Sequence, residues 1–278
     1  MTNNVKKVVS LWSPVAGTGT TFTAINIAKV LGEKGKKVAL LDFDLKLPST
    51  GIYLQMQDIV HCLDNIIPFT AGENLTETII DNNISRIGDI YVLQGTKLPE
   101  QAQYITIKSL EVLVESIKKY FDHIVIDTHN VIDNAGTYVA FQQADVVLVV
   151  VDKSAITVQH YDQVRNIISS SFDLNKFKLI INKCHKNIYM EKQAVEQYMN
   201  FVDSKEIPLL DVGIINALNQ GKWIEYMKTR QAKQYIESIK KIVSSEISFG
   251  AFKELKKPEI AYKQTSLFGF LGGKNNDD

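Results

Sequence analysis

Residues 13–22 read Ser-Pro-Val-Ala-Gly-Thr-Gly-Thr-Thr-Phe, a run of small and hydroxyl-bearing residues. An apolar segment at 5–12 precedes this run, and apolar residues with helical spacing follow it at 24–31. A strand, a glycine-rich turn and a helix N-terminus form a cradle for phosphate, because unpaired backbone N–H groups and the helix dipole both face the anion. We therefore predict a phosphate-binding loop. Its contact residues are Ala16, Gly17, Thr18, Gly19, Thr20, Thr21 and Phe22.

The predicted loop departs from the usual phosphate-binding pattern in its charge. That pattern ends in Gly-Lys-Ser/Thr, where the lysine reaches the outer phosphates and the hydroxyl reaches magnesium. Gly19 and Thr21 keep the glycine and the metal-binding hydroxyl, whereas Thr20 stands in place of the lysine. Pro14 stands in place of the first glycine. The backbone cradle is therefore retained and its lysine charge is lost.

Acidic residues end two further apolar segments. Asp42 and Asp44 lie two residues apart, so a strand end would point both carboxylates the same way, toward a metal-bound or attacking water. Asp127 ends the apolar segment 123–127, the usual place for a carboxylate that holds magnesium through water. We predict Asp44 as the carboxylate that assists catalysis. The predicted magnesium residues, acting through water, are Thr21, Asp42 and Asp127.

Short β-branched segments alternate with helical patterns along most of the chain. The predicted strands are 5–12, 37–42, 90–94, 123–127, 146–152, 178–182 and 208–212. Continuous apolar strands with helical crossovers predict an α/β fold, a mainly parallel sheet of about seven strands with helices on both faces. Ligands bind such sheets at the carboxyl ends of the strands. The loop and the acidic residues converge there with Asn182, which we expect to contact the adenine edge of a nucleotide.

Composition limits the classes of partner. The 278 residues are 45% hydrophobic and 22% charged, as in ordinary soluble proteins. Basic and acidic residues balance at 31 each, so nucleic acid is not an expected partner. Cys62 and Cys184 lack metal-ligand spacing, which favours a reduced, cytoplasmic setting. The longest apolar run, 146–151, is too short to span a membrane.

Taken in order, the loop, Asp42-Phe-Asp-Leu, Ile126-Asp-Thr and Asn182 resemble the motifs of the MinD/ParA superfamily of deviant P-loop ATPases. The resemblance covers nearly the whole globular part of the chain. Asp42-Phe-Asp-Leu is similar to the family's second acidic motif, and Ile126-Asp-Thr to the start of the switch that senses the γ-phosphate. The resemblance implies a P-loop NTPase fold, ATP or ADP with Mg²⁺ as cofactors, and a homodimer.

Four departures from the family pattern bear on hydrolysis. Val15 replaces the signature lysine that reaches the partner subunit's phosphates, and Thr20 replaces the intramolecular lysine. In the switch, His129 replaces a proline and Val131 replaces the glycine whose N–H contacts the γ-phosphate. Lysines on transferring phosphate contribute on the order of a few kcal/mol, or hundreds-fold or more in rate. We therefore expect nucleotide binding with weak or no hydrolysis, at most a slow ATPase.

The chain is most similar to atypical TadZ/CpaE-like members with a degenerate Walker A motif. That resemblance implies a spatial organiser or scaffold for a bacterial pilus or secretion machine, with a protein partner in a membrane-associated assembly. Two alternatives stay open. One is an active ATPase for chromosome or plasmid partitioning or for cell-division site placement, which should carry both lysines. The other is a pseudo-ATPase interaction module that binds no nucleotide.

Helical periodicity ends near residue 248, which predicts a nucleotide-binding domain at 1–248 and a C-terminal tail at 249–278. The tail carries an apolar cluster after several lysines, a pattern typical of a weak interfacial anchor. It is also similar to the membrane-targeting segment of MinD-like proteins, which implies peripheral binding at the inner face of the plasma membrane. A solvated tail, or a strap on the protein's own surface, is the alternative. The predicted docking residues are Leu267, Phe268, Phe270 and Leu271.

Overall fold

The computed structural model describes residues 7–56, 60–72, 74–187 and 190–247. The predicted docking residues Leu267, Phe268, Phe270 and Leu271 lie outside the described residues, as does the proposed tail. No helix within the described ranges is long and apolar enough to cross a membrane.

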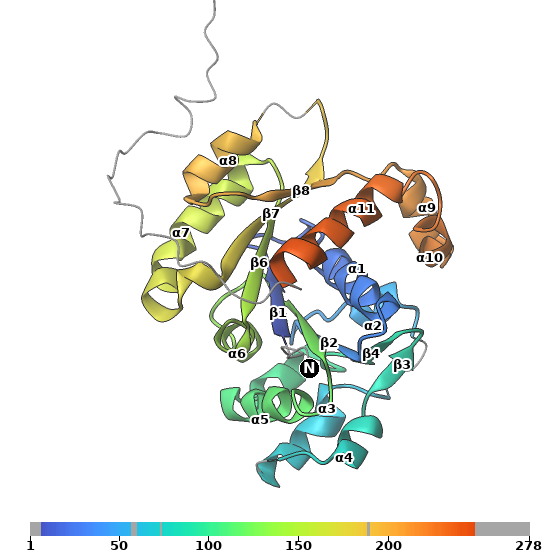
Figure 1. Cartoon of the computed structure of the whole chain (residues 1–278). Coiled ribbons are helices and arrows are strands. Elements are labelled where there is room, and N and C mark those ends of the chain that lie inside the picture. Colours follow the sequence, from blue (N-terminus) through green and yellow to red (C-terminus); the bar gives the residue numbers. More distant parts are fainter. Residues whose placement is uncertain (1–6, 57–59, 73, 188–189, 248–278) are drawn as a thin grey trace, which may run out of the picture.

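Within the described residues, one sheet of eight strands forms the centre of the molecule, in the order β3-β4-β2-β5-β1-β6-β7-β8 (Figure 1). All strand pairs are parallel except β3–β4. The strands are β1 (Lys7–Trp12), β2 (Val38–Phe43), β3 (Ser85–Ile87), β4 (Ile90–Leu93), β5 (His123–Thr128), β6 (Val146–Val151), β7 (Phe177–Cys184) and β8 (Lys205–Pro208). The predicted α/β fold is confirmed, and the extra strand is the short antiparallel edge β3.

The strand predicted at 208–212 is misplaced, because the last strand of the sheet, β8, spans Lys205–Pro208. The chain leaves the sheet at Pro208, where β8 ends. The next side chains are not buried, because Leu209 is 49% and Val212 is 77% exposed. Val212 instead precedes a helix as its N-cap residue. The apolar run was misleading because β8 is an edge strand, built from the more polar Lys205–Pro208 segment.

Helices cover both faces of the sheet (Figure 1). Buried residues of α5–α8 form a core on one face, and those of α1, α10 and α11 form a core on the other. The α-helices are α1 (Thr20–Glu33), α2 (Thr50–Tyr53), α3 (Leu63–Ile66), α4 (Glu77–Asp81), α5 (Ile107–Ile117), α6 (Ala135–Gln143), α7 (Ala155–Ser171), α8 (Lys192–Met199), α9 (Gly213–Asn219), α10 (Trp223–Tyr226) and α11 (Lys233–Ile242). The other helical segments are the 3-10 turns η1 (Ile67–Gly72), η2 (Pro99–Tyr104) and η3 (Leu174–Lys176) and the π-helical η4 (Val243–Ile247).

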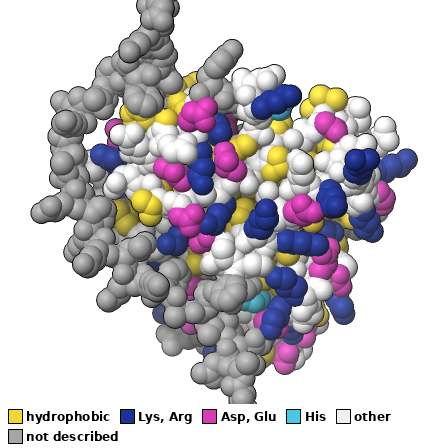
Figure 2. All heavy atoms as spheres, turned by 45° about the horizontal axis from the view of Figure 1, so that its top comes forward, with side chains coloured by type: hydrophobic (Ala, Val, Ile, Leu, Met, Phe, Trp, Pro, Cys, Tyr) yellow, Lys and Arg dark blue, Asp and Glu magenta, His cyan; other side chains and the backbone are white. Residues whose placement is uncertain are grey.

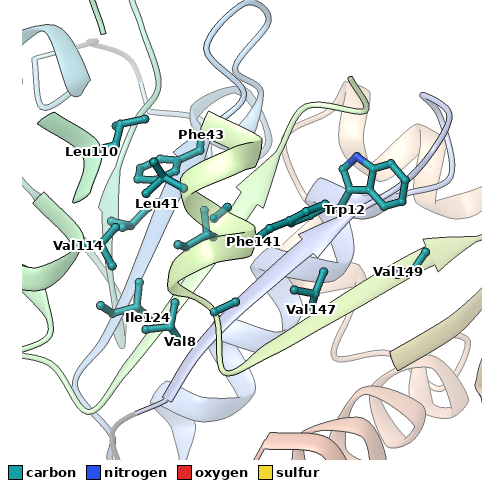
Figure 3. Packing of buried hydrophobic residues seen from close by; sticks show 14 of the residues in the cluster. Val8, Trp12, Leu41, Phe43, Leu110, Val114, Ile124, Phe141, Val147 and Val149 are labelled. Carbon is teal, nitrogen blue, oxygen red and sulfur yellow. The ribbon is translucent and has the colours of Figure 1, made fainter. Parts of the chain in front are cut away.

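Successive residues of one strand belong to different cores, as the two-residue period of a strand requires. Val8 lies in the core beneath α5 and α6, whereas Val9 lies in the core beneath α1. Figure 3 shows Phe141 of α6 packed among strand side chains of the first core. The Phe141 and Trp12 rings meet edge-to-face with centroids 5.6 Å apart. This packing fixes the carboxyl end of β1, from which the phosphate loop emerges.

The surface carries mixed charge. Figure 2 shows lysine and arginine side chains interspersed with aspartate and glutamate over the face in view. This pattern agrees with the equal numbers of basic and acidic residues, 31 each.

Candidate functional site

The predicted site segments meet at the carboxyl ends of the central strands. Asp127 on β5 pairs in register with Leu11 on β1 and with Asp42 on β2. Strand β5 lies between β2 and β1 in the sheet. The topology therefore places Asp127 between Asp42 and the loop that follows β1.

The loop after β1 has the backbone of a phosphate cradle. Gly17 and Gly19 have φ angles of 84° and 91°, in the left-handed region that glycine tolerates best. A Cβ at Gly19 would also lie 2.6 Å from the Asn182 Nδ2 atom. The Thr23 N–H donates to the Gly19 carbonyl at 3.0 Å, which begins the helical hydrogen bonds of α1. The preceding amides at the start of α1 therefore remain for a ligand.

The threonines of the loop contact one another. Thr18 Oγ1 and Thr20 Oγ1 are 3.1 Å apart, and the Thr18 side chain is buried. Thr20 occupies the position of the usual lysine with a neutral hydroxyl. The Thr21 hydroxyl accepts a hydrogen bond from Ser49 Oγ at 3.2 Å, which links the loop to the segment after β2.

Phe22 lies inside the protein. Its ring packs against Trp223, Tyr235 and Tyr53 with centroid distances of 5.3, 5.7 and 5.8 Å. The side chain therefore anchors the first turn of α1 to α2, α10 and α11. Its predicted contact with a nucleotide would have to come from the backbone N–H.

Asp42 is buried and its carboxylate is engaged by the chain itself. Oδ2 accepts from Ser49 N–H (3.0 Å), Thr50 N–H (3.0 Å) and Thr50 Oγ1 (2.8 Å). Oδ1 accepts from Asp44 N–H at 3.1 Å. Burial raises the pKa of Asp42 to about 6, although the bonds from Thr50 oppose the rise. Asp42 thus holds the loop after β2, and its role toward a metal through water stays a prediction.

Asp44 also holds this loop. Its Oδ1 accepts from Leu47 N–H at 3.0 Å and from Lys46 N–H at 3.2 Å. The carboxylate is only half-buried, so a ligand can still approach it. The catalytic role of Asp44 stays a prediction.

Asp127 differs from both of these carboxylates. It is 1% exposed, and no donor of the described residues reaches either carboxylate oxygen with full hydrogen-bond geometry, although the Thr21 hydroxyl and the Thr128 N–H lie near enough to lower its pKa. Burial raises the pKa of Asp127 well above its usual range, and the charges of Asp42 and Asp44 raise it further, while the Thr21 hydroxyl opposes the rise. A buried carboxylate without partners is costly unless a cation compensates it.

Magnesium fits this arrangement. The cation takes oxygen ligands, keeps several waters and binds phosphate oxygens alongside one or two carboxylates. Thr21 and the unpartnered Asp127 would hold it. Among the described residues there is no group of three or more His, Cys, Asp or Glu that could hold a metal ion. Any magnesium held here would therefore take its remaining oxygen ligands from nucleotide phosphates and water.

The end of β7 contacts the loop directly. Asn182 is 4% exposed, and its Nδ2 donates to the Thr18 carbonyl at 2.8 Å. Its Oδ1 accepts from the Lys183 N–H at 2.8 Å. The Lys183 ammonium donates to the Gly17 carbonyl. Asn182 was predicted to contact adenine, and that contact stays a prediction; Lys183 was missed, although a lysine directly after a strand-end asparagine was visible in the sequence.

The loop after β5 is held by hydrogen bonds between its own residues. The N–H of Val131 donates to His129 Nδ1 at 3.0 Å. Asn134 Nδ2 donates to the Val131 carbonyl at 2.6 Å, and Asn134 Oδ1 caps α6 by accepting from the Thr137 N–H at 2.9 Å. The backbone at Val131 is therefore already bonded within its own loop.

Comparisons with known proteins agree with the fold. The model of the AAA domain family matches residues 6–181. The septum site-determining protein MinD of Helicobacter pylori is 25% identical over 256 residues, which cover 88% of this chain and 94% of that protein.

Two solved structures have the same fold. The ParA family ATPase of Chlorobium tepidum superposes with a TM-score of 0.76 at 18% identity, over 85% of this chain and 98% of that one. The septum site-determining protein MinD of Pyrococcus horikoshii, solved in complex with Mg-ADP, gives a TM-score of 0.68 at 19% identity. These regions cover 85% of this chain and 95% of that protein.

Proposed function

The chain belongs to the AAA domain family, within the MinD/ParA superfamily of P-loop ATPases, and from that premise we propose that it binds ATP or ADP with magnesium and hydrolyses ATP slowly or not at all. The observation that carries this proposal is the unpartnered, buried Asp127 beside a glycine-rich loop without lysine.

Binding is supported by groups that do not depend on a lysine. Backbone amides of the loop and the N-terminus of α1 would bind the phosphates. Thr21 and Asp127 would hold magnesium, which neutralises charge on the phosphates. The related MinD that was solved with Mg-ADP makes this cofactor pair the natural one to test.

Two features support slow turnover: the loop lacks both lysines, and the Val131 N–H is already bonded within its own loop. Val15 and Thr20 provide no cation to stabilise charge in the transition state. The Val131 N–H, at the position where the family's switch contacts the γ-phosphate, is donated to His129. Both features reduce stabilisation of the transition state for hydrolysis. The loop amides, Thr21 and Asp127, which would bind the nucleotide before it reacts, remain.

A binding protein with little turnover suits a spatial organiser. We propose a homodimeric scaffold that positions a membrane-associated machine of the pilus or secretion type through a protein partner. Cell-division site placement is the second candidate, favoured by a similarity that extends over 94% of a septum site-determining protein. The loss of both lysines from the loop favours the scaffold over cell-division site placement.

Phosphate release by the purified full chain tests the turnover part of the proposal. We expect a rate close to that of a protein-free control, with magnesium and saturating ATP. Robust hydrolysis that disappears in Asp44→Ala would show an active ATPase and refute slow turnover.

A further inference from the structure

Two side chains from the end of β7 bind consecutive carbonyl groups of the phosphate loop. Lys183 Nζ donates to the Gly17 carbonyl, and Asn182 Nδ2 donates to the Thr18 carbonyl. A trans peptide group points its C=O and N–H in opposite directions. The N–H groups of Thr18 and Gly19, which share these two peptide groups, are therefore turned away from β7.

The backbone of Lys183 is itself unusual. Its φ angle is 55°, in the left-handed region that a lysine seldom adopts. Such conformations persist where the surrounding structure requires them, and they are frequent at functional sites. The Asn182 Oδ1 atom holds the Lys183 N–H at 2.8 Å, which helps to fix this conformation.

The charge of Lys183 has no direct counter-ion in the described part of the chain. The ion pairs found there involve other lysines and one arginine. Asp152 is close enough to feel the Lys183 charge, but its Oδ1 already accepts from Ser154 Oγ at 2.7 Å and Thr157 Oγ1 at 2.6 Å. The ammonium is therefore directed to the loop carbonyl.

We propose that Asn182 and Lys183 form a clamp that aims the Thr18 and Gly19 N–H groups at the phosphates, with Lys183 as the positioning residue that polarises the Thr18 N–H. This inference rests on the proposed function and deepens it. A charged donor on a carbonyl strengthens the hydrogen bonds made by the N–H of the same peptide group. The clamp supplies, through the backbone, part of the positive potential that Val15 and Thr20 do not provide.

The test compares three single variants of the full chain. Lys183→Met keeps the side-chain length and the backbone strain but removes the charge and the donor, whereas Lys183→Arg keeps both. Lys186→Met is the matched control, because Lys186 is an exposed lysine just beyond the same strand. Equilibrium titration with a fluorescent ATP analogue and with a fluorescent ADP analogue, both with magnesium, gives the affinities.

We expect Lys183→Met to weaken binding of both analogues by about tenfold, in line with the loss of a charge-assisted contact. Lys183→Arg should stay within about threefold of the wild type and Lys186→Met should be unchanged. In a Thr20→Lys background the loss caused by Lys183→Met should shrink to about twofold, because a lysine in the loop supplies the charge directly. A merely structural role would give no such compensation.

Backbone amide NMR of the nucleotide-free protein provides a second readout. The Thr18 amide signal should shift in Lys183→Met and stay in place in Lys186→Met. Wild-type affinity in Lys183→Met, or an unmoved Thr18 amide signal, would overturn the clamp while leaving the proposed function intact. If the wild type binds neither analogue, the proposed function fails and the clamp fails with it. Should Lys183→Met not fold, Lys183→Gln makes the same test.

Discussion

Replacing Asp127 by asparagine should stabilise the protein in the absence of nucleotide. Asparagine has nearly the same shape but no charge, and Asp127 is 1% exposed with no well-formed hydrogen bond in the described structure. Desolvating an unpaired polar group costs about 1–3 kcal/mol, and more for a charge. Asparagine still pays the cost of a buried polar group, so only the excess cost of the charge is relieved, and we expect Asp127→Asn to raise the free energy of unfolding at pH 7 by about 1 kcal/mol.

The pH dependence gives the sign of the effect independently. The pKa of Asp127 is raised in the folded state, mainly by burial, and that of Asp42 is raised to about 6. The folded state then binds more protons than the unfolded state, so stability falls as pH rises above the ordinary value of 3.8. For Asp42 the fall is complete above about pH 6, and Asp127 contributes a fall of the same sign. Asp127→Asn should remove the contribution of Asp127 to this decrease of the free energy of unfolding with pH.

Asp152→Asn is the matched control. The bonds from Thr157 and Ser154 outweigh burial and lower the pKa of Asp152, so its stabilisation is present above the ordinary pKa and is lost on acidification. This substitution should destabilise the protein at pH 7. The assay is guanidinium unfolding followed by circular dichroism at pH 5 and pH 7, without magnesium. If Asp127→Asn destabilised the protein as much as Asp152→Asn does, Asp127 could not be an unpaired charge.

Three further predictions concern the loop, the dimer and the tail. Thr20→Lys should tighten nucleotide binding without restoring fast hydrolysis, since Val131 still replaces the switch glycine; a family-like phosphate-release rate in this single variant would contradict that. The protein should sediment as a homodimer with or without ATP, because Val15 provides no cation to the partner's nucleotide; a monomer that dimerises only with ATP would contradict this. The full chain should pellet with anionic liposomes more than either of two variants, a truncation that ends at Thr265 and the substitution Phe268→Asp. Two tails in a dimer would strengthen this binding by avidity. Equal pelleting of all three proteins would contradict a membrane role for the tail.

The sequence was sufficient to predict the segments whose chemistry is local. The glycines of the phosphate loop have left-handed backbone angles because no other residue tolerates them as well, and the strand-end aspartates follow continuous buried strands. Order along the chain then determines where the segments meet, because parallel strands bring their carboxyl ends to one edge. These features required no knowledge of long-range contacts.

Features that depend on tertiary neighbours could not be predicted in this way. Asp42 and Asp127 look equivalent as strand ends, yet only the fold gives Asp42 a full set of donors and leaves Asp127 with no well-formed hydrogen bond in the described structure. The contact of Lys183 with Gly17 spans 166 positions of sequence. The last strand was misplaced because Pro208 ends an edge strand whose residues are largely polar.

Isothermal titration of the full chain with ATP and with ADP, with and without magnesium, tests the central claim most directly. We predict saturable binding in the micromolar-to-millimolar range that depends on magnesium and is strongly weakened in Asp127→Asn, with little ATP consumed during the experiment. The absence of any binding to either nucleotide, with the protein shown to be folded, would contradict the claim and leave an interaction module that uses the fold without its ligand.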